Sequence, residues 1–459
     1  MANVFLTVLG TRFYSECDYF YGNQTIRTKY IQEALIKILG QGWKQENGDK
    51  VVVLLTEDAR EKNYITVDEN DIKLDRLLKE CGLNVEEVKI EVGRNEDELR
   101  QIFNQIVLHT NPGDHVIMDI THSLRNIPIQ ALVALNYAKV LKNVQIEGIY
   151  YGAFEIGVVQ EETKVTKTIK CSCGNGNIER IEGVKRVEIF NLNTYIELLD
   201  WTHAINTFLQ TGSANEVKNL FDQKRNLLNR QQDMSINDLN GVVGALYNFT
   251  TCISNSRGME IKERVKKRNL RSIGIAANNL NVAIKELNRN SEEKIPIAIL
   301  FERVAQEIEP FLDKANLGVG LATVEWCIRY DMIQQGYTAL EESLITFVCR
   351  ETGLDDTDKE LREEKANKIL ACLNLEKKEW KLKEENREFV ENGVNYFTIQ
   401  YPTLKTIANQ VKEKRNDINH FGFRKNALST DILKSELASL YNSFKNEVIN
   451  KSVDVQVYK

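Results

Sequence analysis

The chain has 459 residues, of which 42% are hydrophobic and 27% are charged, and its formal net charge is −6. This length suits two or three domains, and the composition is that of an ordinary globular protein. The five prolines exclude long polyproline linkers, and the negative net charge excludes a general attraction for nucleic acid. A nucleic-acid partner would therefore need a local basic patch.

Cysteine usage and the N-terminus indicate the compartment. Cys171 and Cys173 form a lone C-x-C pair with no second pair at zinc spacing, so we expect reduced thiols and no metal site. We also expect no cofactor. The first ten residues lack the basic region of a signal peptide, and no stretch approaches the 18 apolar residues of a membrane span. We expect a cytoplasmic protein that does not bind membranes.

The first 155 residues alternate between strand-like and helix-like patterns. Apolar runs predict strands at residues 4–9, 51–55, 85–92, 116–120 and 144–150. Helical spacing is clearest at residues 30–39, 96–108 and 129–141. This alternation predicts a Rossmann-like α/β domain whose sheet is mostly parallel and covered on both faces.

Residues 156–192 have a different character. Two stretches rich in Val, Thr, Lys and Glu, at residues 158–170 and 184–190, flank a Cys-Ser-Cys-Gly-Asn-Gly-Asn segment. The Gly-Asn punctuation predicts a β-hairpin, which we interpret as an appendage of the first domain or a linker to the next.

From residue 193 to residue 459 the pattern is helical throughout. Apolar residues recur at helical spacing in residues 198–209, 216–228, 239–254, 282–287, 297–312, 323–352, 401–418 and 431–449. Residues 350–386 are heavily charged, and we expect a solvated insertion or helical hairpin there. The second half of the chain is predicted to be all-α.

A polar loop follows the fourth predicted strand. Parallel sheets bind ligands beyond the carboxyl ends of their strands, and hydroxyl and N–H groups at a helix start suit anions. Alternatively, Ser123 only caps the next helix and Asp119 only orders the loop. We expect a ligand to contact residues of this loop and of the loop after the first strand, namely Gly10, Thr11, Asp119, Thr121, His122, Ser123 and Arg125.

These two loops resemble a known family. Asp-Ile-Thr-His-Ser at residues 119–123, with Leu-Gly-Thr at residues 9–11, resembles the D-x-T-H-G/S signature of CRISPR-associated Rossmann-fold (CARF) sensor domains. Ser123 stands where many relatives carry glycine. The resemblance covers residues 1–155 and implies a homodimer that binds a cyclic oligoadenylate, for which we expect cyclic tetra-adenylate.

A second polar cluster lies near the C-terminus. Leu404, Ile407, Val411 and Ile418 form one stripe of a predicted helix, and Asn416 and His420 project roughly 160° away from it at about 100° per residue. Arg415 lies between that stripe and the polar face. A fixed arginine can stabilise the charge that develops when a 2′-hydroxyl attacks the adjacent phosphate, and a histidine can exchange protons near neutral pH.

This cluster also resembles a known family. Arg415-Asn416-x-x-x-His420, near the end of an all-α region, is similar to the R-N-x-x-x-H motif of HEPN nucleases, whose two motifs meet in a homodimer. With the sensor signature, the chain resembles the CARF–HEPN ribonucleases of type III CRISPR antiviral systems, the Csx group. The resemblance implies a metal-independent endoribonuclease that cuts single-stranded RNA as a homodimer or larger homo-oligomer, with Arg415, Asn416 and His420 as its catalytic residues.

Basic residues near this motif are candidates for RNA contact: Lys412, Lys414, Arg424 and Lys425. Two alternatives remain open. The chain is either a ligand-binding regulator or scaffold whose helical half is inactive, or its sensor also degrades its own activator, with Thr121, His122 and Ser123 contributing. A metal-dependent nuclease at Asp355 or Asp356 is disfavoured, because that chemistry needs its carboxylates on adjoining strands.

Overall fold

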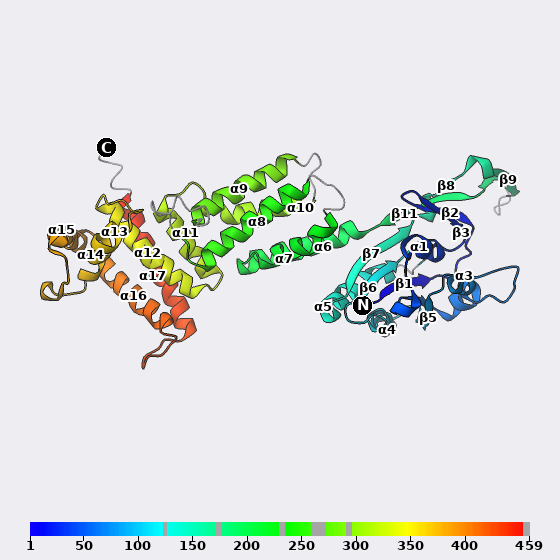
Figure 1. The fold of residues 1–459 in the computed structure, drawn as a ribbon, viewed down its shortest axis with the longest axis horizontal. Helices are drawn as coiled ribbons and strands as arrows, with labels where there is room; N and C mark the ends of the chain where they lie inside the picture. Colours follow the sequence, from blue (N-terminus) through cyan, green and yellow to red (C-terminus); the bar gives the residue numbers. More distant parts are fainter. Residues whose placement is uncertain (123–125, 171–176, 229–234, 259–271, 291–295, 453–459) are drawn as a thin grey trace. The chain divides into compact units, whose positions relative to one another are not determined.

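The computed structural model describes residues 1–122, 126–170, 177–228, 235–258, 272–290 and 296–452. These residues form two compact units, Met1–Glu197 and Leu198–Lys459 (Figure 1). Each unit has hydrophobic cores of its own.

The first unit is built around a nine-stranded sheet. Its strands are β1 (Asn3–Leu9), β2 (Cys17–Tyr21), β3 (Gln24–Thr28), β4 (Lys50–Leu55), β5 (Asn84–Lys89), β6 (His115–Asp119), β7 (Gln145–Gly152), β8 (Val158–Val159) and β11 (Lys185–Asn191). They are arranged in the order β3-β2-β11-β7-β6-β1-β4-β5, with β8 paired to β11. The pairs from β7 through β5 are parallel, which confirms the mostly parallel sheet predicted from the sequence.

Helices cover both faces of this sheet. They are α1 (Ile31–Leu39), α3 (Leu74–Glu80), α4 (Glu96–Leu108) and α5 (Ile127–Lys142), with a turn at α2 (Glu57–Ala59) and η2 (Arg60–Tyr64) after β4. Alternate residues of β1 enter two cores: Phe5 packs in the core that contains α1 and α3, and Leu6 packs in the core that contains α4 and α5. Burial on both faces explains why this strand is a continuous apolar run.

The segment predicted as an appendage is divided between two structures. β9 (Val165–Lys170) pairs with β10 (Asn177–Glu182) as an antiparallel hairpin. β11, by contrast, is a strand of the main sheet, antiparallel to β7 and parallel to β2. It is held there because Val187 and Ile189, on one face of the strand, are buried in the core of the first unit. The β2–β3 hairpin beside it was not predicted.

The second unit is helical in its described residues, as predicted. Its helices are α6 (Asn193–Thr211), α7 (Asn215–Leu228), α8 (Ser235–Ser254), α9 (Ile273–Asn290), α10 (Pro296–Ile308), α11 (Asn316–Arg329), α12 (Ile333–Glu351), α13 (Lys359–Leu361), α14 (Asn367–Cys372), α15 (Glu384–Gln400), α16 (Leu404–Asn419) and α17 (Thr430–Ser452). One core lies among α6–α11, and a second lies among α11–α17. No helix of the described ranges is long and apolar enough to cross a membrane.

Two details of this unit differ from the prediction. The long helix expected over residues 323–352 is interrupted between α11 and α12, where Asp331 adopts a left-handed backbone with φ 56°. The charged segment 350–386 is not simply solvated, because Ile369, Leu370 and Trp380 are buried in the second core. The segment is packed, and even one of its charged side chains, Arg362, is only 11% exposed and donates to Thr346.

Candidate functional sites

The structure brings together the two loops that the sequence predicted at the strand ends. β1 and β6 are parallel neighbours in which Thr7 pairs with Asp119, so their carboxyl ends meet at one edge of the sheet. The loops are in close contact, since a Cβ atom on Gly10 would lie only 2.8 Å from the carbonyl oxygen of His122. Any side chain at position 10 would push the loops apart.

Asp119 is the buried anchor of this edge. It is fully buried, and its carboxylate accepts hydrogen bonds from the Thr7 hydroxyl at 2.7 Å and the Thr121 backbone N–H at 2.9 Å. The amide of Gln32 donates to the same carboxylate at 3.3 Å. Burial raises the pKa of Asp119, and the hydrogen bonds oppose that shift. These contacts fit the interpretation in which Asp119 orders the loop for other residues to use.

His122 lies against the ring of Tyr14, with 4.1 Å between the ring centroids. Its Nε2 atom is buried and has no hydrogen-bond partner within the described part of the chain. Burial lowers the pKa of His122 to about 4, so the imidazole is neutral at pH 7. The site therefore offers a neutral, unsatisfied ring nitrogen, a group that can hydrogen-bond to a nucleobase or a hydroxyl.

Thr121 and Thr11 have different surroundings. The Thr121 hydroxyl accepts a hydrogen bond from the Gly152 N–H at 2.8 Å, which ties this loop to the end of β7. Thr11 is exposed beside Gly10. Two further predicted ligand-binding residues, Ser123 and Arg125, lie outside the described residues.

Sequence reasoning missed two side chains that shape this site. The Gly10 N–H donates to the Tyr14 hydroxyl at 2.9 Å, and the Asn63 amide donates to the carbonyls of Gly10 and Arg12. Asn63 comes from η2, after the neighbouring strand β4. No motif marks either residue, because their roles come from the packing of three separate loops.

The second predicted site lies at the end of α16. The helix ends at Asn419, and His420 is its C-cap, with its backbone N–H donating to the Asn416 carbonyl at 3.0 Å. His420 is exposed, whereas Leu404, Ile407 and Val411 are buried in the core as the stripe predicted. The imidazole therefore lies at the surface one residue beyond the helix rather than within it.

Arg415 is held by a partner that the sequence did not reveal. Its Nε atom forms an ion pair with Oε2 of Glu341, on α12, at 3.0 Å. Burial raises the pKa of Glu341, and the charge of Arg415 opposes that shift. About a third of the Arg415 side chain is exposed, so the guanidinium has a fixed position and access to solvent.

The four predicted RNA-contacting residues fall into two groups. Lys412, Arg424 and Lys425 are exposed. Lys414 is buried, and its ammonium pairs with Glu436 of α17 at 2.8 Å. Burial lowers the pKa of Lys414, so the ion pair offsets a real desolvation cost. In this conformation Lys414 joins α16 to α17.

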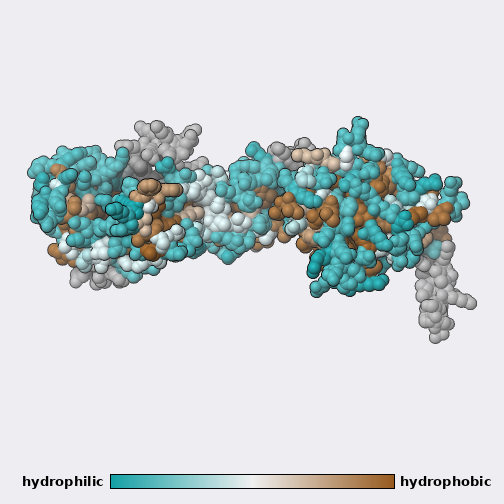
Figure 2. Space-filling model, turned by 90° about the horizontal axis from the view of Figure 1, so that it is seen from below, coloured by the Kyte–Doolittle hydropathy of each residue, from teal (hydrophilic) through white to brown (hydrophobic). Residues whose placement is uncertain are grey.

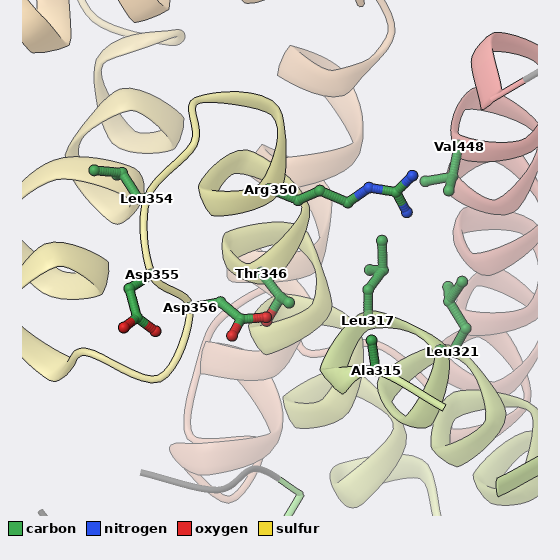
Figure 3. Close-up of a pocket in the computed structure, with 10 residues that line it drawn as sticks. Ala315, Leu317, Leu321, Thr346, Arg350, Leu354, Asp355, Asp356 and Val448 are labelled. Atoms are coloured by element: carbon green, nitrogen blue, oxygen red, sulfur yellow. The ribbon is translucent and has the colours of Figure 1, made fainter. Parts of the chain in front are cut away.

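A pocket of about 590 Å³ in the second unit lies apart from these residues. It is lined by Ala315, Leu317, Gly318, Leu321, Thr346, Arg350, Leu354, Asp355, Asp356 and Val448. Figure 3 shows Arg350 extending toward Val448, with Asp355 and Asp356 on the loop after α12. Asp356 accepts from the Asn316 amide and Asp355 from Thr357. None of its lining residues belongs to either predicted site.

Comparison with known proteins assigns the first unit. Residues 4–155 match the family model of the CARF domain of CRISPR system endoribonuclease Csx1. Together with the mostly parallel sheet and the loops at its strand ends, this match defines the N-terminal unit as a CARF domain, a class of ligand-binding domain.

One relative carries the comparison further. The chain is 25% identical over 174 residues to the CRISPR-associated protein MJ1674 of Methanocaldococcus jannaschii. The similarity covers 35% of this chain and 24% of that relative, so the chain spans about a quarter of the relative's length. The family model supports a CARF domain, and both comparisons support a CRISPR-associated protein.

Proposed function

We propose that this protein is a cyclic-oligoadenylate-activated, metal-independent endoribonuclease that cuts single-stranded RNA in type III CRISPR antiviral defence. The observation that carries the proposal is the presence, on one chain, of a CARF domain and a helix end that presents a fixed arginine and an exposed histidine. The first supplies a ligand sensor, and the second supplies groups suited to RNA cleavage.

The ligand would bind where the loops after β1 and β6 meet. Gly10, Thr11, Thr121 and His122 offer backbone groups, hydroxyls and a neutral imidazole, which suit the phosphates and adenine edges of a cyclic oligoadenylate. Asp119 would position these loops without touching the ligand, since both of its carboxylate oxygens already accept hydrogen bonds within the protein. The amide nitrogens of Gln32 and Asn63 add hydrogen bonds that hold the same loops.

The cleavage chemistry would use His420 and Arg415. A neutral His420 removes the proton of a 2′-hydroxyl, whose oxygen attacks the adjacent phosphorus and displaces the 5′-oxygen of the next nucleotide. A protonated imidazole then gives that leaving oxygen its proton, which yields a 2′,3′-cyclic phosphate and a 5′-hydroxyl. Arg415 stabilises the added negative charge on the phosphorane, and Asn416 orients the histidine or a phosphate oxygen.

A homodimer is supported by an exposed apolar stripe on α5. Ile129, Val133, Tyr137 and Val140 recur along this helix and are 50–87% exposed. Figure 2 shows hydrophobic residues gathered on the face of the first unit where Figure 1 places α5. An apolar stripe of this kind is typical of a protein–protein interface. A two-fold contact here would pair two sensor sites.

An RNA-cleavage assay tests the proposal directly. Labelled single-stranded RNA is incubated with the protein and EDTA, with cyclic tri-, tetra- or hexa-adenylate or with no activator. We expect one ring size to stimulate cleavage and the products to end in a 2′,3′-cyclic phosphate. Arg415→Ala and His420→Ala should each lower the rate by at least about a hundredfold. Undiminished activator-dependent cleavage by the His420 variant would contradict the assignment.

The contact between Glu341 and Arg415 favours a second candidate function. With its arginine paired, the helical half would be inactive and the chain would act as a ligand-binding regulator or scaffold. This candidate predicts tight binding of the cyclic oligoadenylate with no RNA cleavage at any ring size.

Incubating the protein with the ligand and searching for linear products tests whether the sensor also degrades its own activator.

A further inference from the structure

The loop between α16 and α17, residues 420–429, begins at the proposed catalytic histidine and carries two exposed phenylalanines. Phe421 is 95% exposed and Phe423 is 93% exposed. Aromatic side chains of this size normally bury most of their surface, so two nearly bare ones only two positions apart indicate a contact with another molecule. Residues 420–429 are called the aromatic loop below.

The backbone of the aromatic loop is unusual at the same place. Phe421 has φ 58° and Gly422 has φ 68°, so two successive residues are left-handed. Glycine adopts this conformation freely, but a bulky residue such as phenylalanine does so at a cost. No burial of the Phe421 side chain within the described chain offsets that cost. Strain of this kind is concentrated at functional sites.

The aromatic loop is nevertheless firmly attached to α16. The Gly422 N–H donates to the Asp417 carbonyl, and the Phe423 N–H donates to the His420 carbonyl. At the far end of the loop, the Leu428 N–H donates to the buried Asp417 carboxylate at 3.0 Å. One residue of α16 therefore holds both ends, and the phenylalanines keep a fixed relation to the helix end.

The charge of the aromatic loop suits an anionic partner. Arg424 and Lys425 follow Phe423 directly and are exposed. Figure 2 shows hydrophobic residues among hydrophilic ones on the face of the second unit where Figure 1 places this loop. Aromatic rings beside cations form the platforms on which proteins bind single-stranded nucleic acid, since every base has a face that can stack. A purely apolar partner would leave the two cations unused.

We propose that Phe421 and Phe423 stack on bases of single-stranded RNA while Arg424 and Lys425 contact its phosphates. This inference rests on the proposed ribonuclease function and deepens it. Because Phe421 follows His420 directly, bases stacked on the aromatic loop place a neighbouring phosphodiester linkage beside the imidazole. The aromatic loop is thus a substrate-positioning element that tolerates many sequences.

Equilibrium RNA binding tests the inference in the full chain. The His420→Ala background prevents cleavage, and the fluorescence anisotropy of a labelled single-stranded RNA of mixed sequence reports the Kd. We expect Phe421→Ala and Phe423→Ala to weaken binding roughly tenfold each. Phe423→Leu should weaken it as much as alanine, and Phe423→Trp should preserve it, because only the latter keeps a stacking face.

Two controls separate stacking from other effects. Ile399→Ala removes a 75% exposed apolar side chain from α15 of the same unit, and should leave the Kd unchanged. Arg424→Gln should lower the slope of log K against log salt by about one, whereas the phenylalanine variants should keep the slope. The mass of the protein in solution, measured by light scattering, should be the same for all variants, which shows that none of them changes the oligomeric state.

Each outcome decides the inference. The aromatic loop is not a stacking platform if the alanine variants bind RNA as tightly as the His420→Ala parent. The same conclusion follows if Phe423→Leu binds as tightly as that parent, or if the alanine variants lose affinity only because their mass in solution has changed. If the unaltered protein cleaves RNA while the phenylalanine variants keep full affinity for RNA, only this inference fails. If the parent binds RNA through the aromatic loop but the chain with His420 never cleaves it, only the ribonuclease proposal fails. If the parent binds no RNA, both fail.

Discussion

His122 and Asp119 lie three positions apart, and burial shifts the proton equilibria of both toward the uncharged form. It raises the pKa of the Asp119 carboxyl and lowers that of the His122 imidazole. At the edge of the sheet where the loops meet, these two groups would therefore recognise the proposed ligand by hydrogen bonding more than by charge. Positive charge for ligand phosphates must come from other residues.

The pKa of His122 gives a test at this scale. Its pKa of about 4 in the folded protein lies below the ordinary histidine value of 6.5, so the unfolded chain binds the extra proton first as the pH falls. The contribution of His122 to stability is therefore complete above pH 6.5 and is lost as the pH falls toward 4, by up to about 3 kcal/mol. Side-chain ¹H–¹⁵N spectra should show a neutral ring at pH 5.5.

His122→Gln provides the matched control, because glutamine does not titrate. Its melting temperature should fall less than that of the parent between pH 7 and pH 4.5. A midpoint near 6.5 for His122 in the spectra would contradict this prediction, because it would mean that the ring is solvated.

At the residue scale, short motifs revealed the groups that carry the proposed chemistry but not the groups that hold them. Arg415 and His420 were predicted because a fixed spacing joins them in one segment. Glu341, Tyr14 and Asn63 were not, because each meets its partner from a different helix or loop. Such contacts exist only after packing, and a single sequence carries no signal for them.

At the scale of elements, prediction succeeded where burial was one-sided or complete. β1, β4 and β6 are buried on both faces and appear as apolar runs, and α4 begins and ends as its periodicity indicated. β2, β3 and β11 mix charged and apolar residues, so their sequence pattern is weak. Their places in the sheet depend on pairing partners far along the chain.

The exposed stripe of α5 yields a test of the proposed dimer interface. Val133 is 55% exposed on this helix, and we expect Val133→Glu to raise the dimer dissociation constant at least about a hundredfold, because an unpaired carboxylate would be buried in the contact. Light scattering over a dilution series measures the change. Ile399→Glu, an equally drastic change on α15, should leave the mass as it is. A fully dimeric Val133 variant would move the interface elsewhere.

At the scale of the whole molecule, the proposed sensing and the proposed cleavage lie on two units that one stretch of chain joins. β11 ends at Asn191 and α6 begins at Asn193, so only Leu192 separates the last strand of the sheet from the first helix of the second half. The boundary between the units falls within α6. We infer that a change at the sheet reaches the helices through regular structure and not through a slack linker.

Linkage predicts that the effects of ligand and RNA are reciprocal. In the His420→Ala chain, which should still bind its activator, the factor by which cyclic oligoadenylate tightens RNA binding must equal the factor by which RNA tightens ligand binding. We expect a factor of roughly 5–150, measured by calorimetry in both orders of addition. A factor of one would show that the two sites are independent.

The place of β11 in the sheet has a consequence for dissecting the protein. This strand lies between β2 and β7, yet the matched CARF segment ends at residue 155, well before it. A fragment cut at residue 155 would lose the strand that joins the β2–β3 hairpin to the sheet. The edge of β7 would then be open to pairing between molecules, which is a route to aggregation. During synthesis, likewise, the sheet cannot close until residue 191 has left the ribosome. A fragment meant to fold alone should therefore extend beyond Asn191.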